Sequence, residues 1–221
     1  MAGEDHVTAA RAVYDMAAPR YVHFVGTEIS SATEGPIDQS LLVAFVELVK
    51  RQTIDLVADV GCGPGRVAAF MAERGLDVVG VDVSQAMLTV ARSAHPHIRF
   101  EEGQLDALPF ETGVLAGAVC WYSIIYTPID RLAEAFGELA RVLMPRGYLL
   151  LAFQAEGEPV HRTDAHGTQL PLTSYRHSVQ EVAVCLVDIG FKIYATILRA
   201  PELEHETTPQ GFVIACSPPP S

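Results

Sequence analysis

The sequence has few of the residues that mark disulfide-bonded, metal-binding or nucleic-acid-binding proteins. Its four cysteines, Cys62, Cys120, Cys185 and Cys216, form no C-x-x-C pair, which argues against a zinc site and a disulfide framework. No run of Lys and Arg occurs, and the formal net charge is −12, which disfavours nucleic acid and anionic membranes as partners. No apolar stretch approaches membrane-spanning length. These absences predict a cytoplasmic protein with no metal, nucleic-acid or membrane partner.

The composition indicates a globular chain with a substantial core. Of the 221 residues, 49% are hydrophobic and 19% are charged, a balance that excludes a disordered chain. This length suits one sizeable α/β domain and is too short for two. The N-terminal stretch "MAGEDHVTAARAVYDMAAP" lacks the basic start and apolar block of a signal peptide.

Short apolar strands alternate with helical patterns through the first two thirds of the chain. The expected strands are 56–60, 77–82, 98–102, 114–122 and 147–153, and the helical patterns between them are 66–75, 84–94 and 130–144. Ser84 is the predicted N-cap of the second of these helices. Near-continuous apolar strands separated by helices predict a parallel sheet that is covered on both faces.

The last third has a different pattern. Residues 154–178 are polar and rich in histidine, which predicts a loop; a helix at 179–190 and strands at 191–199 and 211–217 follow. Those two strands can pair antiparallel at the sheet edge. The prediction is a single α/β domain, a doubly wound, mostly parallel seven-stranded sheet ending in an antiparallel hairpin. Its expected parts are an N-terminal helical lid (1–40), a core (41–153), a substrate loop (154–178) and a closing helix and hairpin (179–216).

A glycine loop follows the first strand. Gly61, Gly63 and Gly65 allow close approach of a ligand to the backbone. A dinucleotide-binding loop would have its third glycine where Arg66 stands, which weakens a pyrophosphate interpretation. Asp82 ends the second strand, where a carboxylate accepts hydrogen bonds from ribose hydroxyls; nicotinamide cofactors and S-adenosylmethionine share that requirement.

Asp59 discriminates between these two ligands. A carboxylate two residues before the first glycine would repel a pyrophosphate but suits a ligand that carries an ammonium and a sulfonium. The pattern D-x-G-x-G-x-G therefore favours S-adenosylmethionine, with S-adenosylhomocysteine as the product.

Four ordered motifs carry a family resemblance. "ADVGCGPG", "VVGVDVSQAML", "GQLDALPF" and "ELARVLMPRGYLLLAF" resemble, in order and spacing, the motifs of class I S-adenosylmethionine-dependent methyltransferases that act on small molecules. The resemblance runs from Leu41 to the C-terminus and implies a Rossmann-like fold. It also implies a set of cofactor-binding residues: Asp59, Gly61, Cys62, Gly63 and Gly65 in the loop, Asp82 at the ribose, Val83, Met87, Gln104 and Leu105 around the adenine, and Cys120 near the methionine amino group.

The chain departs from the family pattern at three places. Gln104 stands where the family often has Asp, although its amide oxygen can still accept from the adenine amine. Leu115 and Ala116 replace a frequent Phe-Asp pair, and Arg146 replaces a turn glycine. None of these changes touches the glycine loop.

Aromatic residues near the expected strand ends point to the acceptor. The predicted substrate-binding residues are Tyr14, Tyr21, Trp121, Tyr122 and Tyr175, which would give flat walls suited to a planar molecule. An oxygen, nitrogen or indole-like carbon acceptor must lose a proton, and a histidine can take it. His161 and His166 are the candidate bases, and Tyr126 is the candidate catalytic residue that orients the acceptor. We therefore predict methyl transfer to a small aromatic or heteroaromatic metabolite in specialised metabolism.

Several alternatives stay open at this point. "WYSI" after the fourth strand lacks the Pro-Pro-aromatic motif of DNA amino-methyltransferases, and Arg66 with Asp59 disfavours a nicotinamide oxidoreductase. A non-aromatic acceptor, or a non-catalytic regulatory protein that binds S-adenosylmethionine, would keep the same cofactor loop. The sequence leaves the oligomeric state open between a monomer and a homodimer.

Overall fold

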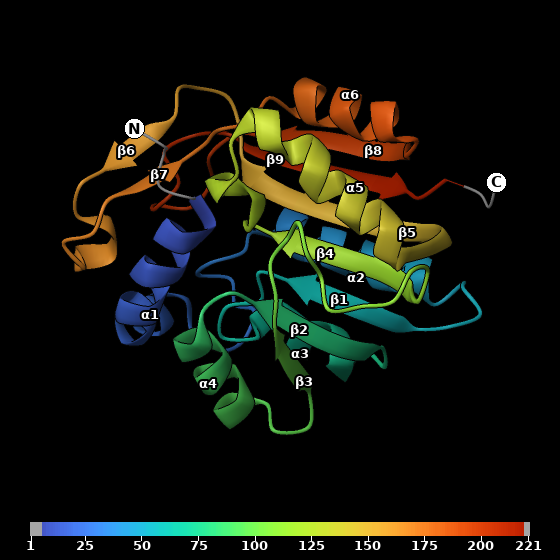
Figure 1. Ribbon diagram of the computed structural model, residues 1–221, viewed down its shortest axis with the longest axis horizontal. Coiled ribbons are helices and arrows are strands. Elements are labelled where there is room, and N and C mark those ends of the chain that lie inside the picture. Colours follow the sequence, from blue (N-terminus) through green and yellow to red (C-terminus); the bar gives the residue numbers. More distant parts are fainter. Residues whose placement is uncertain (1–5, 219–221) are drawn as a thin grey trace.

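The computed structural model describes residues 6–218, and a seven-stranded sheet lies at its centre (Figure 1). The strands run in the order β3-β2-β1-β4-β5-β9-β8. Their bounds are β1 Leu56–Val60, β2 Asp77–Asp82, β3 Arg99–Glu102, β4 Leu115–Trp121, β5 Leu143–Gln154, β8 Lys192–Arg199 and β9 Gln210–Cys216. Strands β1 to β5 pair in parallel, whereas β9 is antiparallel to both β5 and β8. The predicted fold class, with its antiparallel hairpin at the sheet edge, is confirmed.

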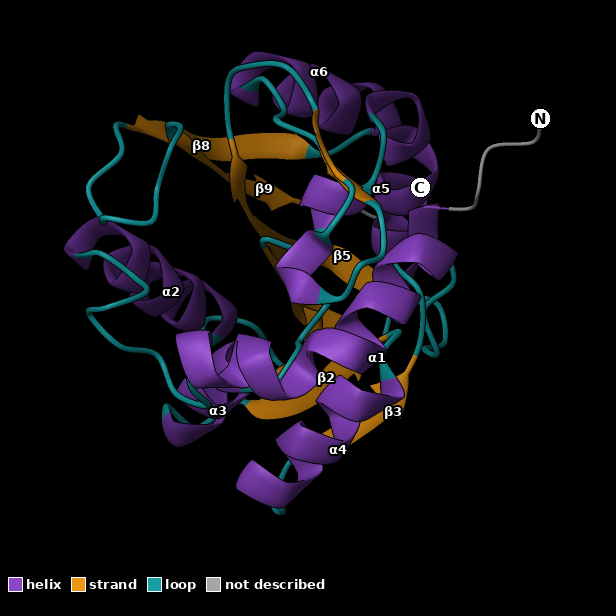
Figure 2. Cartoon of the chain, turned by 90° about the vertical axis from the view of Figure 1, so that its left-hand side faces the viewer, coloured by secondary structure: helices purple, strands orange, loops and turns teal. Residues whose placement is uncertain are grey.

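Helices cover both faces of the sheet (Figure 2). On one face, α2 (Pro36–Val49), α3 (Arg66–Glu73) and α4 (Gln85–Ala94) contribute to a cluster of buried side chains that includes Phe45 and Met71. On the other, α5 (Leu132–Val142) and α6 (Val179–Ile189) close a second cluster around Phe136 and Phe153. Burial on both faces explains why the central strands are nearly continuous apolar runs in the sequence.

Two segments differ from the sequence expectation. Strand β5 begins at Leu143, so residues predicted to end a helix and form a turn already belong to the strand. The segment 154–178, predicted as a loop, contains β6 (Val160–Arg162) and β7 (Leu172–Ser174), which pair antiparallel around a 3-10 turn, η3 (Ala165–Gly167). Strands of three residues are too short to show a periodic apolar pattern, so the sequence could not reveal them.

The N-terminal helix α1 (His6–Val25) packs against α4, η3 and β7, beside the carboxyl ends of the parallel strands (Figure 1). Asp15 joins α1 to the start of α4, because its Oδ1 accepts hydrogen bonds from Ser84 Oγ (2.7 Å) and Ala86 N (3.2 Å). Ser84 Oγ also accepts from Met87 N at 3.2 Å, which confirms the predicted N-cap. On its other side, α1 is bonded to η1 (Ile124–Tyr126), since the Tyr14 and Tyr126 hydroxyls lie 2.5 Å apart.

Candidate active site

The glycine loop turns tightly between β1 and α3. Gly61, Gly63 and Gly65 have φ values of 74°, 52° and 85°, in the left-handed region that glycine tolerates. A Cβ at Gly61 would collide with the side chain of Ser123, which follows β4. The Gly61 and Cys62 amides donate to Val81 O at 2.7 and 3.0 Å, so the loop is held against the end of β2. The backbone between β1 and α3 is therefore fixed in place and has no side chain at its three glycines.

Asp82 lies at the end of β2, beside this loop. Its Oδ2 accepts from Gly63 N and its Oδ1 from Ser84 N, both at 2.8 Å. Burial raises its pKa above the ordinary value, whereas these backbone donors act in the opposite direction. An ionised carboxylate offers about four lone-pair positions, so two remain for hydroxyl donors of a ligand. This arrangement suits a ribose.

A cavity of about 130 Å³ opens over the loop; we call it the first cavity. Six of the predicted cofactor residues line it: Gly61, Gly63, Asp82, Val83, Met87 and Leu105. The predicted residues Tyr14, Tyr21, Trp121, Tyr122 and Tyr126 line it as well. Residues from the ends of four parallel strands and from α1 thus surround one space at the carboxyl edge of the sheet, where such sheets bind ligands.

The other predicted cofactor residues lie outside the lining of this cavity. Asp59 is 1% exposed, and its Oδ2 accepts from Ala68 N (2.9 Å) in the first turn of α3. Burial raises the pKa of Asp59 to about 7. In this structure the Asp59 side chain holds the helix that follows the loop, and its direct contact with a cofactor stays a prediction.

Four further residues that the sequence predicts to bind the cofactor also lie outside the lining of the first cavity. Cys62 and Cys120 are buried in the two hydrophobic clusters, and Gly65 packs against Phe100 at the start of α3. The Gln104 backbone pairs with that of Ala107. A backbone group can serve a ligand without its side chain lining the cavity, so the sequence motif alone could not separate the two cases.

An aromatic cluster connects α1 to the rest of the site. The Tyr14 ring centroid lies 5.2 Å from that of Tyr21, 5.6 Å from that of Tyr126 and 5.4 Å from that of His166. Partial burial, with a smaller contribution from the charge of Arg162, lowers the pKa of His166. Its imidazole is therefore neutral near pH 7 and able to accept a proton. Burial raises the pKa of Tyr126, so its hydroxyl stays protonated.

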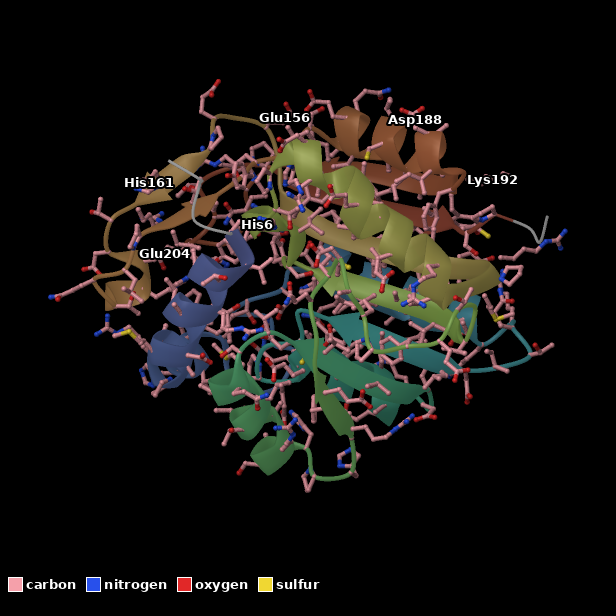
Figure 3. The ribbon with its side chains drawn as sticks, viewed as in Figure 1. His6, Glu156, His161, Asp188, Lys192 and Glu204 are labelled. Atoms are coloured by element: carbon pink, nitrogen blue, oxygen red, sulfur yellow. The ribbon has the colours of Figure 1, made fainter. Side chains whose placement is uncertain are left out.

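His161 and Tyr175 lie apart from this cluster. His161 is exposed on β6 (Figure 3), and its Nδ1 is 2.9 Å from Thr173 Oγ1 on β7. The Tyr175 ring stacks on that of His177 with centroids 6.3 Å apart. Both residues line a separate recess along β7 and neither lines the first cavity. Their predicted roles would require a rearrangement of the β6–β7 segment.

A second cavity of about 210 Å³ adjoins the first, and four aromatic residues line both: Tyr21, Trp121, Tyr122 and Tyr126. His166 lines only the second. The sequence analysis missed most of its polar residues: Glu34, Gln154, His205, Glu206, Thr208 and Gln210. One available signal is the connection 200–209 between β8 and β9, which is long for a hairpin and therefore has room for residues that reach a ligand site.

Comparisons with known proteins agree with this geometry. The family model described as a methyltransferase domain matches residues 57–147. Residues 57–147 therefore form a domain of the kind found in the class I S-adenosylmethionine-dependent methyltransferases. Their cofactor is S-adenosylmethionine, and the lining of the first cavity, with a free glycine backbone and a carboxylate at the ribose position, fits it.

Individual relatives extend the comparison. The chain is 31% identical over 131 residues to a malonyl-[acyl-carrier protein] O-methyltransferase of Pectobacterium atrosepticum, covering 58% of this chain and 51% of that protein. It thus spans about half the length of this curated relative. Magnesium protoporphyrin IX methyltransferase from Synechocystis PCC 6803, solved with bound S-adenosylmethionine, has the same fold, with a TM-score of 0.70 at 20% identity over 98% of this chain and 99% of that one. The [4+2]-cyclase SpnF also shares the fold, with a TM-score of 0.74 at 16% identity over 96% of each chain.

Two further features of residues 6–218 bear on partners. Within that range no helix combines the length and apolar character needed to cross a membrane. No group of three or more His, Cys, Asp or Glu side chains among those residues is arranged to hold a metal ion.

Proposed function

We propose that this protein transfers a methyl group from S-adenosylmethionine to an oxygen, nitrogen or indole-like carbon atom of a small aromatic metabolite, in the cytoplasm. One observation carries the proposal: two cavities meet at four aromatic side chains, and one of them opens over the glycine loop and Asp82. Flat aromatic walls stack favourably on a planar acceptor. A sulfonium methyl in the first cavity would then face an acceptor in the second.

The chemistry needs alignment more than acid–base work. S-adenosylmethionine supplies an activated methyl group with a neutral thioether as the leaving group. The acceptor's electron pair would form the new bond to the methyl carbon while the carbon–sulfur bond breaks. The electrons of the broken bond stay on sulfur. The aromatic side chains that line both cavities hold the two partners in line and exclude water. The proton that the acceptor loses passes to the neutral imidazole of His166, within the cluster that contains Tyr14 and Tyr126.

The first experiment is calorimetric titration of the full chain with S-adenosylmethionine and, separately, with a reduced nicotinamide cofactor. We expect binding of the first alone, and Asp82→Ala should weaken it by at least tenfold because the ribose loses its acceptor. Binding of neither ligand, or of the nicotinamide alone, would overturn the proposal. Aromatic acceptors are then screened by mass spectrometry for a gain of one methyl group.

The two histidines provide a matched pair for the catalytic step. His166→Gln should lower kcat about tenfold to a hundredfold at pH values where the wild-type imidazole is neutral, with a smaller loss at low pH where that imidazole is itself protonated, and leave the Kd of S-adenosylmethionine unchanged. His161→Gln should leave both values within twofold, because His161 lines neither cavity. An equal loss of kcat in both variants would show that neither imidazole acts as the base.

The second candidate is a protein that binds S-adenosylmethionine without transferring its methyl group. This candidate is retained because the chain shares its fold with a [4+2]-cyclase, and a shared fold does not determine which reaction a protein catalyses. Tight cofactor binding with no methylated product from any acceptor class would favour this candidate.

A further inference from the structure

The charged side chains that line the second cavity are already paired within the protein. Among residues 6–218, Arg66 is the one Lys or Arg in its lining. The Arg66 Nη1 donates to Glu34 Oε1 at 2.7 Å and to Thr33 Oγ1 at 3.2 Å. Both charged side chains of this pair are buried, with 10% and 2% exposed. The positive charge that could attract an anionic ligand is therefore compensated before a ligand arrives.

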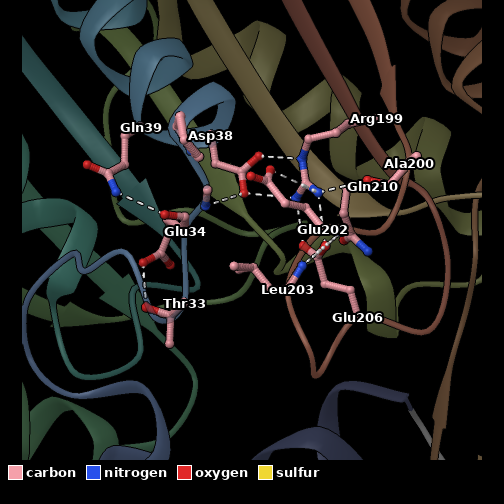
Figure 4. Close-up of polar contacts among 12 residues, drawn as sticks. Thr33, Glu34, Asp38, Gln39, Arg199, Ala200, Glu202, Leu203, Glu206 and Gln210 are labelled. Carbon is pink, nitrogen blue, oxygen red and sulfur yellow. Dashed lines mark hydrogen bonds and ion pairs between the residues drawn. The ribbon is translucent and has the colours of Figure 1, made fainter.

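A second compensated network lies at the wall of this cavity that contains Glu206 (Figure 4). Arg199 donates from Nε and Nη2 to the two carboxylate oxygens of Asp38, each at 2.9 Å. It also donates to Glu206 Oε1 at 2.6 Å and to Oε2 at 2.9 Å. Although burial opposes ionisation, the hydrogen bonds from Arg199 and from two backbone amides lower the pKa of Glu206 to about 2. Two carboxylates share one guanidinium, so this wall has an excess of negative charge.

One buried hydrogen-bond donor, in a side chain that lines both cavities, has no partner among the described residues. The Trp121 indole ends β4, lines both cavities and is 6% exposed. Its Nε1 makes no hydrogen bond to any of the described residues. A buried N–H group without an acceptor is costly and uncommon, so its presence at a ligand cavity indicates a ligand acceptor. The next residue, Tyr122, has a φ of 60°, a strained conformation for a non-glycine residue that is characteristic of functional sites.

We propose that the second cavity selects an uncharged acceptor molecule and binds a carbonyl oxygen of it through the Nε1–H of Trp121. This inference rests on the proposed function and adds the substrate class. A carboxylate in this cavity would meet a guanidinium already paired with Glu34 and a wall with excess negative charge, and would lose its hydration without compensation. A neutral carbonyl loses less hydration and gains the free N–H donor.

Matched probes test the selection on the full chain. Each of three ring systems (phenol, 2-naphthol and indole) is used with an acetyl, a carboxylate or an ethyl substituent. Binding is measured by ligand-observed NMR at pH 7.5, with and without S-adenosylhomocysteine. We expect the acetyl compound to bind best in at least one series, with a Kd at least tenfold below that of its carboxylate partner. Equal or tighter carboxylate binding, or no binding of any acetyl compound, would overturn the proposal.

Trp121→Phe tests the hydrogen bond while it keeps an aromatic ring at the site. The Kd of the acetyl probe should rise about fivefold to tenfold, whereas that of the ethyl probe should change less than twofold. An equal rise for both probes would show that Trp121 contributes packing alone and would contradict the assigned role.

Glu34→Gln tests the charge argument in the opposite direction. It removes the negative charge that compensates the Arg66 guanidinium, so the carboxylate probe should bind at least fivefold more tightly than it does to the wild type. Unchanged carboxylate binding in a folded variant would contradict the charge argument. If thermal unfolding shows that this variant does not fold, the wild-type selectivity and the Trp121→Phe variant still decide the proposal.

Failure of this inference is distinguishable from failure of the proposed function. Titrations without S-adenosylhomocysteine report on the second cavity even if the first binds no cofactor. If S-adenosylmethionine binds and methylated products form only on carboxylate-bearing acceptors, methyl transfer is right and the neutral acceptor is wrong.

Discussion

The two halves of the site are built in different ways. The cofactor half, formed by the glycine loop and the ends of β2 and β3, presents backbone and one carboxylate, and most of it lies within a single strand–helix–strand unit. The acceptor half gathers side chains from α1, the segment before α2, the end of β4 and the connection 200–209. A surface made of neighbouring backbone can be recognised from a short motif, whereas a surface made of distant side chains exists only after folding.

Buried acidic residues show the same contrast. Asp59, in the cofactor half, accepts one backbone hydrogen bond, and burial raises its pKa to about 7. Glu206, in the acceptor half, accepts from Arg199 and two backbone amides, and its pKa is lowered to about 2. Burial penalises the charge in both positions, and at Glu206 the hydrogen bonds from the guanidinium and the two backbone amides outweigh this penalty.

The largest predicted effect comes from a methyl group added to the cofactor half. Gly61→Ala places a Cβ against Ser123 at a φ of 74°. We expect a loss of about 3 kcal/mol in the free energy of unfolding, from overpacking (~1–3 kcal/mol) and the left-handed backbone (~1–2 kcal/mol). Affinity for S-adenosylhomocysteine should fall by at least a hundredfold. Urea denaturation and calorimetry measure the two quantities.

Gly75→Ala is the matched control. Gly75 has a φ of 85°, but a Cβ there would meet nothing within 4 Å. It should lose only the backbone contribution, about 1 kcal/mol, and keep its cofactor affinity within twofold. Equal losses of stability and of cofactor affinity in the two variants would show that the left-handed backbone conformation, not the contact with Ser123, requires glycine at position 61.

The second prediction concerns pH and the contrast between Asp59 and Glu206. A folded pKa of about 7 against an ordinary 3.8 means that the stability from protonated Asp59 is complete below pH 3.8 and is lost as pH rises through about 7. Asp59→Asn keeps the acceptor for Ala68 N and removes this titration. The variant should therefore gain about 2 kcal/mol relative to the wild type between pH 5.5 and 8.5.

The comparison between variant and wild type is the essential readout for this prediction. Buried His177 has a lowered pKa, so its contribution to stability is lost as pH falls, opposite to the contribution of Asp59. Both proteins contain His177, so its contribution cancels when the stability of the wild type is subtracted from that of Asp59→Asn. Thermal unfolding of the cofactor-free protein at several pH values measures it. A constant difference across that range would mean that Asp59 is ionised throughout.

The smallest predicted effect is at the contact between the lid and the cofactor half. Asp15→Ala removes the acceptor for Ser84 Oγ and Ala86 N, so α1 should be held less firmly against α4. The Kd of S-adenosylhomocysteine should rise about fivefold, the equivalent of about 1 kcal/mol. Calorimetry measures this change, and limited proteolysis within α1 should become faster.

Arg11→Ala is the control on the same helix. Arg11 pairs with Glu102 at 3.2 Å, and both side chains are about 40% exposed. Exposed ion pairs contribute little, so this variant should change the Kd less than twofold. A larger effect than that of Asp15→Ala would place the important lid contact at β3.

Local pattern predicted much of the fold and the cofactor half. The bounds of β1 and β2 agree with the expected strands, and the Ser84 cap is present. The short strands β6 and β7 were missed because their pairing, not their composition, defines them. Asp59 was interpreted by its charge, yet its side chain bonds the first turn of α3. His161 and His166 could not be distinguished by sequence, since both lie in one polar segment.

The sequence by itself determined the order of strands and helices, the glycine loop and the class of cofactor. These features depend on apolar periodicity and on backbone conformations that neighbouring residues set. The tertiary structure alone decided which side chains line the proposed acceptor cavity. It also decided that Arg66 is paired with Glu34, that Glu206 is paired with Arg199, and that the Trp121 N–H has no partner among the described residues. Such features arise where folding brings separate segments together, as when Arg199 of β8 meets Asp38 of α2, and no local pattern records which groups will meet there.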